Sequence, residues 1–447
     1  MNILFNQKFR ITVGCAVFLL VSLASSHLYT QLKTKQLAKQ DQFFTQQENF
    51  TPLKSQISLR SNQVVHKLDF KLKNPLMSKQ ISDEIIDKQN AFSSQRNLLA
   101  AFAPYPVVDE FKKYKFSING SQVVTPVKLP SSKVNFNQED LLTVLVNTRK
   151  YFQNYSLEDP DILRTGMLAT QGVTVPDVLN TLNFMIAVLK EDIANNRATR
   201  LQDSKFINSN FRVIKWAAYN PNNKQQKQLR ITKYAVFTHP GSRKKTSTFN
   251  TPIYSLKETY NKDKFYTKYT KQDVLSGIYE PGGREFGKVT SLAYLTRNGL
   301  EEAIMEGTIL INFTDGYKAF FNVDRNNGMA YIRGLKATAQ KRYWYFREVD
   351  AIKGYGYKID AKISIKPGVT FAGDVLNIGL GKVVVIEHTK GGRKHLQMGV
   401  IADTGGAFLP NLYQLDFLAG IFKNKKEFGQ HITQLPEYAT AYFLVKK

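Results

Sequence analysis

The amino-acid sequence predicts a mainly β protein with peripheral helices. From residue 228 onward, β-branched and aromatic residues alternate with polar ones between Gly, Asn and Pro, which is the pattern of half-buried strands. Clear helical periodicity lies before residue 200, and no internal repeat of about 20 to 50 residues is visible. These observations favour a barrel, or a pair of barrels, with helices packed outside.

Two amphipathic helices are expected first along the chain. Apolar residues recur three and four apart from residue 140 to 151 and again from 178 to 193. The second segment carries a start signal, because Thr174 can cap free amides, Pro176 suits the first turn and Asp177 favours the positive end of the helix dipole. Residues 27–135 precede both helices as a polar extension of unknown role, with short alternating runs between 107 and 127.

The expected strands come after residue 220. They are residues 228–240, 248–256, 309–323, 382–387, 396–402 and 441–445. Asp315-Gly316 divides 309–323 with a hairpin turn. The basic run of Lys423, Lys425 and Lys426 is expected to form a solvated loop.

Length and charge limit the class of protein. The chain has 447 residues, enough for two compact domains and an additional segment. Its formal net charge of +26 favours a polyanionic partner, either nucleic acid or the acidic envelope of a bacterial cell.

The N-terminus favours export. Lys8 and Arg10 precede an apolar run over residues 11–24, and small residues follow it, as in a signal peptide. The run is shorter than the roughly 20 residues of a spanning helix. We therefore expect a cleaved signal over residues 1–26, with an uncleaved membrane anchor as the alternative.

Cys15 is the only cysteine, so a processed chain has no disulfide and no thiolate site.

Two carboxylates near the C-terminus are candidates for acid/base chemistry. A hydrophobic strand leads into Asp403, Gly405-Gly406 opens a turn, and Asp416 follows in the next extended run. Carboxylates placed in this way can meet at one groove. The alternative for Asp403 is a structural role, in which its side chain caps backbone amides at the glycine turn.

The other motifs in the sequence do not indicate a further catalytic or cofactor site. The chain contains no P-loop, no dinucleotide-binding glycine fingerprint and no GxSxG elbow. His388 and His395 flank a basic turn and are expected at the surface rather than in a metal site, so no metal or other cofactor is predicted. The aromatic run over residues 343–346 forms either core packing or a platform on which sugar or base rings stack.

The order of several short motifs resembles the membrane-bound lytic murein transglycosylase A family, with its C-terminal 3D domain. The motifs are Phe206-Ile207 with Phe211, Thr232-Lys233-Tyr234, Thr238-His239-Pro240, Thr251-Pro252-Ile253-Tyr254, the segment from Thr270 to Gly277, Ile378-Gly379-Leu380-Gly381, and Asp403-Thr404-Gly405-Gly406-Ala407 with Asp416. The resemblance covers roughly the 300 residues from about residue 140 to the C-terminus. Where the family has Gln-Gly-Ser-Gly, this chain has Glu306-Gly307-Thr308-Ile309.

The resemblance implies a double-psi β-barrel domain with a smaller inserted β domain. The barrel would be formed by residues 136–239 and 336–447, and the insertion by residues 240–335. It also implies cleavage of the bond between N-acetylmuramic acid and N-acetylglucosamine in peptidoglycan, with formation of a 1,6-anhydro ring. Asp416 would act first as acid and then as base, supported by Asp403 and Thr404. Tyr234, Glu306, Gly307 and Thr308 would contact the glycan.

The predicted protein is therefore an exported enzyme of the cell envelope that binds peptidoglycan glycan strands. The alternative is a non-catalytic peptidoglycan-binding protein of the same fold. Nucleic acid is not an expected partner, because the export signal would direct the protein away from the cell compartment that contains nucleic acid.

Overall fold

The computed structural model describes residues 104–109, 116–260, 263–332, 334–405, 408 and 410–447. The expected signal or anchor and most of the polar extension lie outside these residues. Among the described residues no single helix has the length and apolar composition to cross a bilayer, and only the pair Pro160–Gln171 and Val175–Ala194, bent by 96°, passes that test jointly.

Both predicted amphipathic helices are present. Helix α5 (Gln138–Tyr155) begins at Asn137, whose side chain accepts hydrogen bonds from two backbone amides. Helix α6 (Val175–Ala194) begins with a reciprocal capping box between Thr174 and Asp177. The other helices are α4 (Gly120–Val123), α7 (Ser204–Asn210), α8 (Lys271–Leu275), α9 (Arg297–Ala303) and α10 (Lys425–Ile432), with 3₁₀ turns at Pro160–Leu163, Gly166–Gln171, Arg200–Gln202, Glu258–Tyr260, Phe265–Lys268, Ala337–Ala339 and Ile359–Ala361.

Six strands of the large sheet close into a ring. They are β6 (Leu229–Gly241), β15 (Gln414–Phe422), β12 (Thr370–Ala372), β14 (Arg393–Asp403), β13 (Val383–Lys390) and β16 (Tyr438–Lys446), and β6 pairs with both β15 and β16. Consecutive residues Val384 and Val385 of β13 are both fully buried, so this strand is covered on both faces. The predicted barrel is thus present as a closed set of hydrogen-bonded strands.

Further strands extend the ring at two places. Strand β16 pairs with β5 (Phe211–Trp216), which pairs with β3 (Val124–Val127), and β14 pairs with β4 (Val134–Asn135). Strands β3 and β4 come from the expected polar extension, so the sheet begins before residue 136 in sequence. A separate short sheet joins β1 (Pro104–Pro106) to β2 (Ser117–Asn119).

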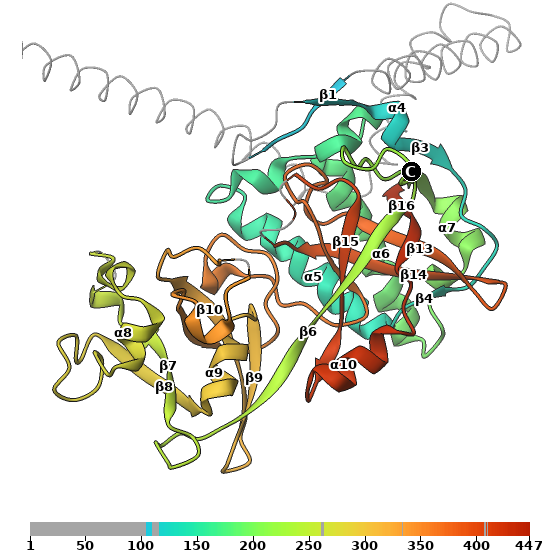
Figure 1. The fold of residues 1–447 in the computed structure, drawn as a ribbon. Helices are drawn as coiled ribbons and strands as arrows, with labels where there is room; N and C mark the ends of the chain where they lie inside the picture. Colours follow the sequence, from blue (N-terminus) through green and yellow to red (C-terminus); the bar gives the residue numbers. More distant parts are fainter. Residues whose placement is uncertain (1–103, 110–115, 261–262, 333, 406–407, 409) are drawn as a thin grey trace, which may run out of the picture. The chain divides into compact units, whose positions relative to one another are not determined.

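Strand β6 continues beyond the ring into a second group of strands (Figure 1). Its end pairs with β9 (Thr308–Phe313), and β10 (Lys318–Asn326) and β11 (Trp344–Val349) follow in the same sheet. The hairpin between β9 and β10 turns at Asp315-Gly316 as predicted, and Gly316 has a φ of 86° there. Strands β7 (Thr251–Leu256) and β8 (Val289–Leu295) form a two-stranded sheet nearby.

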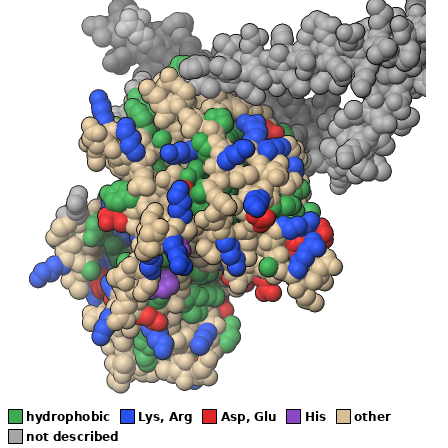
Figure 2. All heavy atoms as spheres, turned by 90° about the vertical axis from the view of Figure 1, so that its right-hand side faces the viewer, with side chains coloured by type: hydrophobic (Ala, Val, Ile, Leu, Met, Phe, Trp, Pro, Cys, Tyr) green, Lys and Arg blue, Asp and Glu red, His purple; other side chains and the backbone are tan. Residues whose placement is uncertain are grey.

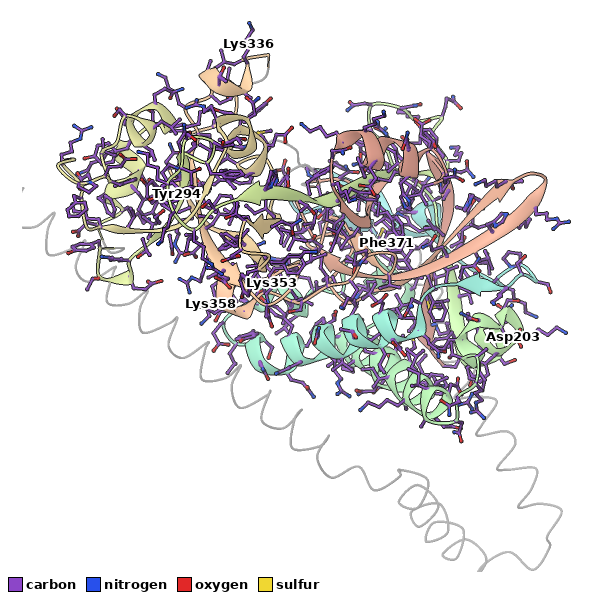
Figure 3. The ribbon with its side chains drawn as sticks, turned by 90° about the horizontal axis from the view of Figure 1, so that it is seen from below. Asp203, Tyr294, Lys336, Lys353, Lys358 and Phe371 are labelled. Atoms are coloured by element: carbon purple, nitrogen blue, oxygen red, sulfur yellow. The ribbon has the colours of Figure 1, made fainter. Side chains whose placement is uncertain are left out.

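The second group of strands has its own hydrophobic core. Ile253, Leu295, Ile311 and Tyr345 are fully buried in it. The core includes residues up to Phe346, beyond the expected domain boundary at residue 335. In Figure 3, Tyr294 of β8 and Phe371 of β12 mark the two groups of strands, and Lys353 lies on the segment that joins β11 to β12.

Two sequence expectations differ from the structure. Lys425 and Lys426 open helix α10 rather than a loop, because Asn424 caps the helix by accepting a hydrogen bond from the Glu427 amide. Strand β7 begins at Thr251 rather than at residue 248, because the preceding residues turn, with the Thr246 amide donating to the Phe249 carbonyl.

On one face of the molecule, basic side chains are scattered rather than gathered in one stripe. On the face shown in Figure 2, Lys and Arg side chains are spread over the described part of the molecule, with fewer Asp and Glu side chains between them. A scattered distribution gives long-range attraction to polyanions without marking one docking groove.

Candidate active site

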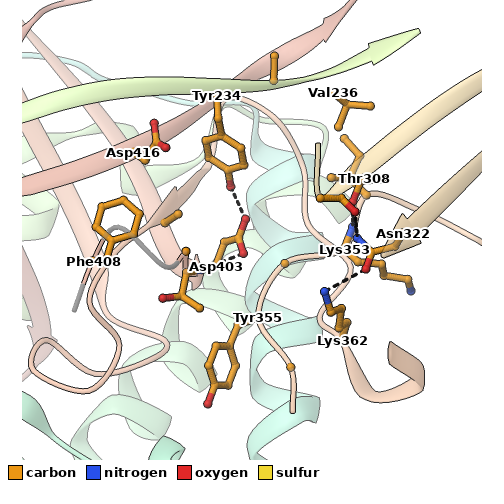
Figure 4. Close-up of a pocket in the computed structure, with 18 residues that line it drawn as sticks. Tyr234, Val236, Thr308, Asn322, Lys353, Tyr355, Lys362, Asp403, Phe408 and Asp416 are labelled. Carbon is orange, nitrogen blue, oxygen red and sulfur yellow. Dashed lines mark hydrogen bonds between the residues drawn. The ribbon is translucent and has the colours of Figure 1, made fainter. Parts of the chain in front are cut away.

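A cavity of about 410 Å³ contains most of the predicted site residues. It is lined by Tyr234, Ala235, Val236, Gly307, Thr308, Asn322, Ile352, Lys353, Gly354, Tyr355, Gly356, Lys362, Ala372, Asp403, Thr404, Gly405, Phe408 and Asp416. In Figure 4, Tyr234, Asp403 and Asp416 lie on one side of this cavity, and Thr308, Asn322 and Lys362 lie on the other. The volume is within the usual range for a small-molecule or sugar site, roughly 300–1,000 Å³.

Asp416 is positioned by the ring of strands. It lies on β15 between β6 and β12, paired with Thr232 and Ala372. Its neighbours Leu415 and Phe417 are buried on the other face of β15, because successive side chains of a strand alternate. This alternation aims the Asp416 carboxyl group into the cavity.

The surroundings of Asp416 favour its protonated form. Burial raises the pKa of this carboxyl group to about 6, although the Thr232 side chain and the Lys233 ammonium act in the opposite direction. Its Oδ1 atom is buried and has no hydrogen-bond partner among the described residues. Near neutral pH, this carboxyl group can therefore give a proton away or take one up.

Asp403 lies at the end of β14 and has a different environment. The Tyr234 hydroxyl donates to its Oδ2 atom at 2.6 Å, and the Thr404 amide donates to its Oδ1 atom at 2.8 Å. Burial raises the pKa of Asp403 to about 6, while these two hydrogen bonds and the Lys362 charge lower it. Both carboxylate oxygens are engaged by the protein, and the Thr404 hydroxyl fixes the turn by donating to Gly373 O at 2.8 Å.

The opposite wall is a short chain of hydrogen bonds. The Asn322 amide nitrogen donates to Gly307 O at 2.8 Å and to Thr308 Oγ1 at 2.7 Å. Lys362 Nζ then donates to Asn322 Oδ1 at 2.9 Å. The first two bonds fix the orientation of the amide, so its oxygen is presented to the ammonium group.

Glu306 is the predicted site residue that does not line the cavity. Its Oε2 atom lies 3.2 Å from His239 Nε2, and both side chains are largely buried. The contact with His239 of β6 holds the carboxylate away from the cavity, whereas Gly307 and Thr308 remain in its lining. The expectation that Glu306 contacts the glycan is therefore not supported by its position in this structure.

The structure brings together residues that the sequence motifs did not single out. Asn322 and Lys362 complete the second wall, and Tyr355 and Phe408 add aromatic surface. Asn322 could have been found from the hairpin register, because it stands opposite Thr308 across β9 and β10. Lys362 lies between β11 and β12, and no local pattern marks it.

The other candidate sites have structural roles. Tyr343, Tyr345 and Phe346 are fully buried, which confirms core packing, and the Arg342 guanidinium lies 4.4 Å from the ring centroid of half-buried Trp344. The rings of His388 and His395 stack across β13 and β14 at 5.4 Å. No group of three or more His, Cys, Asp or Glu side chains in the described part of the chain is arranged to hold a metal ion.

Comparison with known proteins finds similar solved structures only. No family model and no curated protein matches the chain. A membrane-bound lytic murein transglycosylase from Agrobacterium tumefaciens matches with 16% identity and a TM-score of 0.48, covering 71% of this chain and 98% of its own. MltA from Escherichia coli with bound chitohexaose matches with 16% identity and a TM-score of 0.48, covering 75% and 97%. MltA from Neisseria gonorrhoeae matches with 15% identity and a TM-score of 0.47, covering 77% and 97%. These matched structures are of the family that the motifs between Phe206 and Asp416 resemble.

Proposed function

We propose that this protein is a peptidoglycan lytic transglycosylase. The observation that carries the proposal is the Asp416 carboxyl group, which faces a cavity, has a pKa raised to about 6 and leaves one oxygen without a partner among the described residues. A single carboxyl group of this kind can serve as acid and then as base in the same turnover. The motif resemblance supplies the substrate class, which is the glycan strand of murein.

The proposed reaction uses one carboxyl group because the nucleophile, the 6-hydroxyl oxygen of the muramic acid, belongs to the substrate. Protonated Asp416 gives its proton to the glycosidic oxygen as the bond to C1 of the muramic acid breaks. The resulting carboxylate takes the proton of the 6-hydroxyl group as that oxygen attacks C1 and closes the 1,6-anhydro ring. Asp416 ends the cycle protonated, and no water is consumed. A two-carboxylate hydrolase would instead activate water or form a glycosyl-enzyme.

The other predicted residues would hold the substrate and the catalytic group in place. Asp403 is engaged by Tyr234 and Thr404, so we assign it a positioning role rather than a proton transfer. Gly307 and Thr308 would contact the sugar from the opposite wall, since a Cβ atom at Gly307 would meet nothing within 4 Å and its backbone is therefore accessible. Glu306 would act indirectly, through its contact with His239.

We propose that the ring of six strands is a double-psi barrel and that residues 240–335 form the core of an inserted β domain. The closed ring and the separate hydrophobic core support these assignments. The expected signal or anchor at residues 1–26 would direct the protein to the cell envelope, where it would meet peptidoglycan. The net charge of +26 is consistent with an anionic wall.

Digestion of purified murein tests the function. Wild-type protein is expected to release 1,6-anhydromuropeptides, and Asp416→Asn should lower the rate by at least about 100-fold because it removes the acid/base group. Asp315→Asn is the matched control: it is the same change at an exposed turn, and it should retain wild-type activity. Release of reducing ends without anhydro products would indicate hydrolysis and overturn the proposed mechanism.

A non-catalytic binding protein is the second candidate. It is favoured by one observation, the replacement of the expected amide by Glu306, whose carboxylate contacts His239 instead of the cavity. This candidate predicts that the protein sediments with murein while no soluble product appears, and that Asp416→Asn binds as strongly as wild type.

A further inference from the structure

We propose that the Lys362 ammonium binds the free carboxylate of the lactyl group on muramic acid, so that the cavity selects peptide-free glycan strands. This inference rests on the proposed function and assigns a substrate class within it. The residue is absent from the motifs that carry the family resemblance, and it is identified by its position in the cavity.

Lys362 is a cation built into the cavity wall. Its side chain is half-buried, and its Nζ atom donates to Asn322 Oδ1 at 2.9 Å. No carboxylate of the described residues lies within 4.0 Å of this nitrogen. An ammonium group has three donors, so donors remain for a ligand.

Burial of the Lys362 side chain disfavours the charged form of its ammonium group. Loss of solvent lowers the pKa of Lys362, and the charges of Asp403 and Asp324 compensate from a distance. A bound anion in direct contact would stabilise the charged form further, because ion pairs in partly desolvated sites are stronger than those in water. The wall is therefore complementary to a negatively charged group.

The neighbouring lysine provides an internal comparison. Lys353 lines the same cavity, but its Nζ atom is 2.5 Å from Asp350 Oδ1 and donates to Ser364 Oγ at 2.9 Å. The charge of Lys353 is already paired within the protein. Lys362 is thus the better candidate of these two ammonium groups for binding an anionic substituent.

The geometry of the substrate favours the lactyl group. Its ether oxygen is attached to C3 of the same muramic acid ring whose C1 would face Asp416. Asp416 and Lys362 lie on opposite sides of the cavity (Figure 4), so one ring between them could present C1 to the acid and its substituent to the cation. In a peptide-bearing strand, the lactyl carboxyl is an amide and carries no charge. The carboxylates of the stem peptide lie farther from the ring.

Equilibrium binding to the Asp416→Asn protein tests the inference without turnover. Three fluorescent glycans of equal length are compared: one peptide-free, one peptide-free with its carboxylates reduced to alcohols, and one bearing peptides. Each is measured with the additional change Lys362→Met and, as a matched control, Lys353→Met. Circular dichroism of every variant confirms that it is folded.

We expect the peptide-free glycan to bind at least about tenfold more tightly than the other two, the usual contribution of one charge-assisted hydrogen bond. Lys362→Met should abolish this preference, and Lys353→Met should retain it. Equal binding of the three glycans would overturn the inference. Preference for the peptide-bearing glycan, lost in Lys362→Met, would assign the cation to stem-peptide carboxylates and would also overturn it.

A parallel digestion of the same three glycans with wild-type protein separates the two proposals. The peptide-bearing glycan is expected to give anhydro products more slowly than the peptide-free glycan, but not to resist cleavage. Anhydro products with equal binding of all three glycans would overturn the lactyl selection and leave the lytic function intact. Selective binding of the peptide-free glycan without any anhydro product would overturn the lytic function and leave carboxylate recognition by Lys362 supported.

Discussion

Two carboxyl groups in the cavity have similar pKa values but different capacities for proton transfer. Burial raises the pKa of Asp403 and of Asp416 to about 6 in each case. Asp403 accepts from Tyr234 and from the Thr404 amide, so moving its proton would disturb two hydrogen bonds. Asp416 has an oxygen without such a bond among the described residues. Hydrogen bonding, rather than pKa, therefore separates the acid/base group from the positioning group.

The pH dependence of activity should follow Asp416. The reaction begins with the protonated acid, so kcat/KM is expected to fall as pH rises through about 6. The Lys233 charge lowers the pKa of Asp416, so Lys233→Met should raise it and move this alkaline limb to higher pH. Rates of anhydro product release from pH 4 to 9 measure the shift. Lys227→Met changes a lysine at an exposed position, so it should not change the pH at which kcat/KM falls. If this pH shifts equally in both variants, the fall in activity does not report the charge of Lys233 beside Asp416.

The free energy of unfolding should also depend on the raised pKa of Asp416. The pKa of Asp416 in the folded protein, about 6, exceeds its ordinary value of 3.8, so its favourable contribution to stability is present below pH 3.8 and is lost as pH rises through about 6. Asp416→Asn should therefore increase the free energy of unfolding at pH 8 by about 1–2 kcal/mol and change it little at pH 4. Urea titrations at both pH values measure this difference.

The unfolding free energy of Asp403→Asn provides the comparison with that of Asp416→Asn. An amide nitrogen cannot accept the hydrogen bond now made by the Thr404 amide or by the Tyr234 hydroxyl, so one of these bonds is lost. This variant should be less stable than wild type by roughly 1–3 kcal/mol at pH 4, where the charge is absent. Equal behaviour of the two Asn variants would show that the carboxyl groups do not differ in the way described.

The sequence motifs mark one wall of the site and, through Gly307 and Thr308, only part of the other. Asp403 and Asp416 stand in a recognisable strand and turn context, so they could be predicted together with Tyr234. Asn322 and Lys362 are brought in by long-range pairing and by an irregular segment, which short motifs do not encode. Glu306 was expected in the wall because it stands where the resembled family has Gln, and its contact with His239 is a tertiary interaction that the sequence does not reveal.

At the scale of elements, periodicity predicted the parts of the chain with regular burial. Helices α5 and α6 and the β9–β10 hairpin follow their patterns closely, because each has one apolar face and clear end signals. The order of strands could not be read in this way. Ring closure depends on the pairing of β6 with both β15 and β16, which are far from it in sequence.

A buried ion pair joins two short helices in the second group of strands. Lys271 of α8 is fully buried, and its Nζ atom lies 2.5 Å from Glu301 Oε2 of α9, while Arg297 lies 2.7 Å from the other oxygen. Glu301→Gln leaves Lys271 buried without a charged partner, so we expect a loss of about 3–5 kcal/mol. Lys271→Met leaves Glu301 paired with Arg297 and should cost less. Urea unfolding of both variants tests this order, and the reverse order would show that Lys271 does not depend on Glu301.

At the scale of the whole molecule, the positive charge acts over a longer range than the cavity. The net charge of +26 is spread over many side chains, as the face in Figure 2 shows for the described residues. Such a field raises the concentration of an anionic polymer near the protein without selecting a particular bond. Selection of the bond would depend on Asp416 and its cavity, which salt screens less because they are partly buried.

Binding to murein and binding of a neutral glycan should therefore respond differently to salt. Raising the ionic strength from about 0.01 M to about 0.5 M shortens the screening length from about 30 Å to about 4 Å, so cosedimentation with murein should weaken several-fold. The affinity for a neutral chito-oligosaccharide should change little, because this ligand carries no charge to be screened. The two titrations use the same protein and buffers, so each is the control for the other. If salt weakens both equally, long-range charge does not account for the attraction to murein; if it weakens neither, the association depends on the cavity alone.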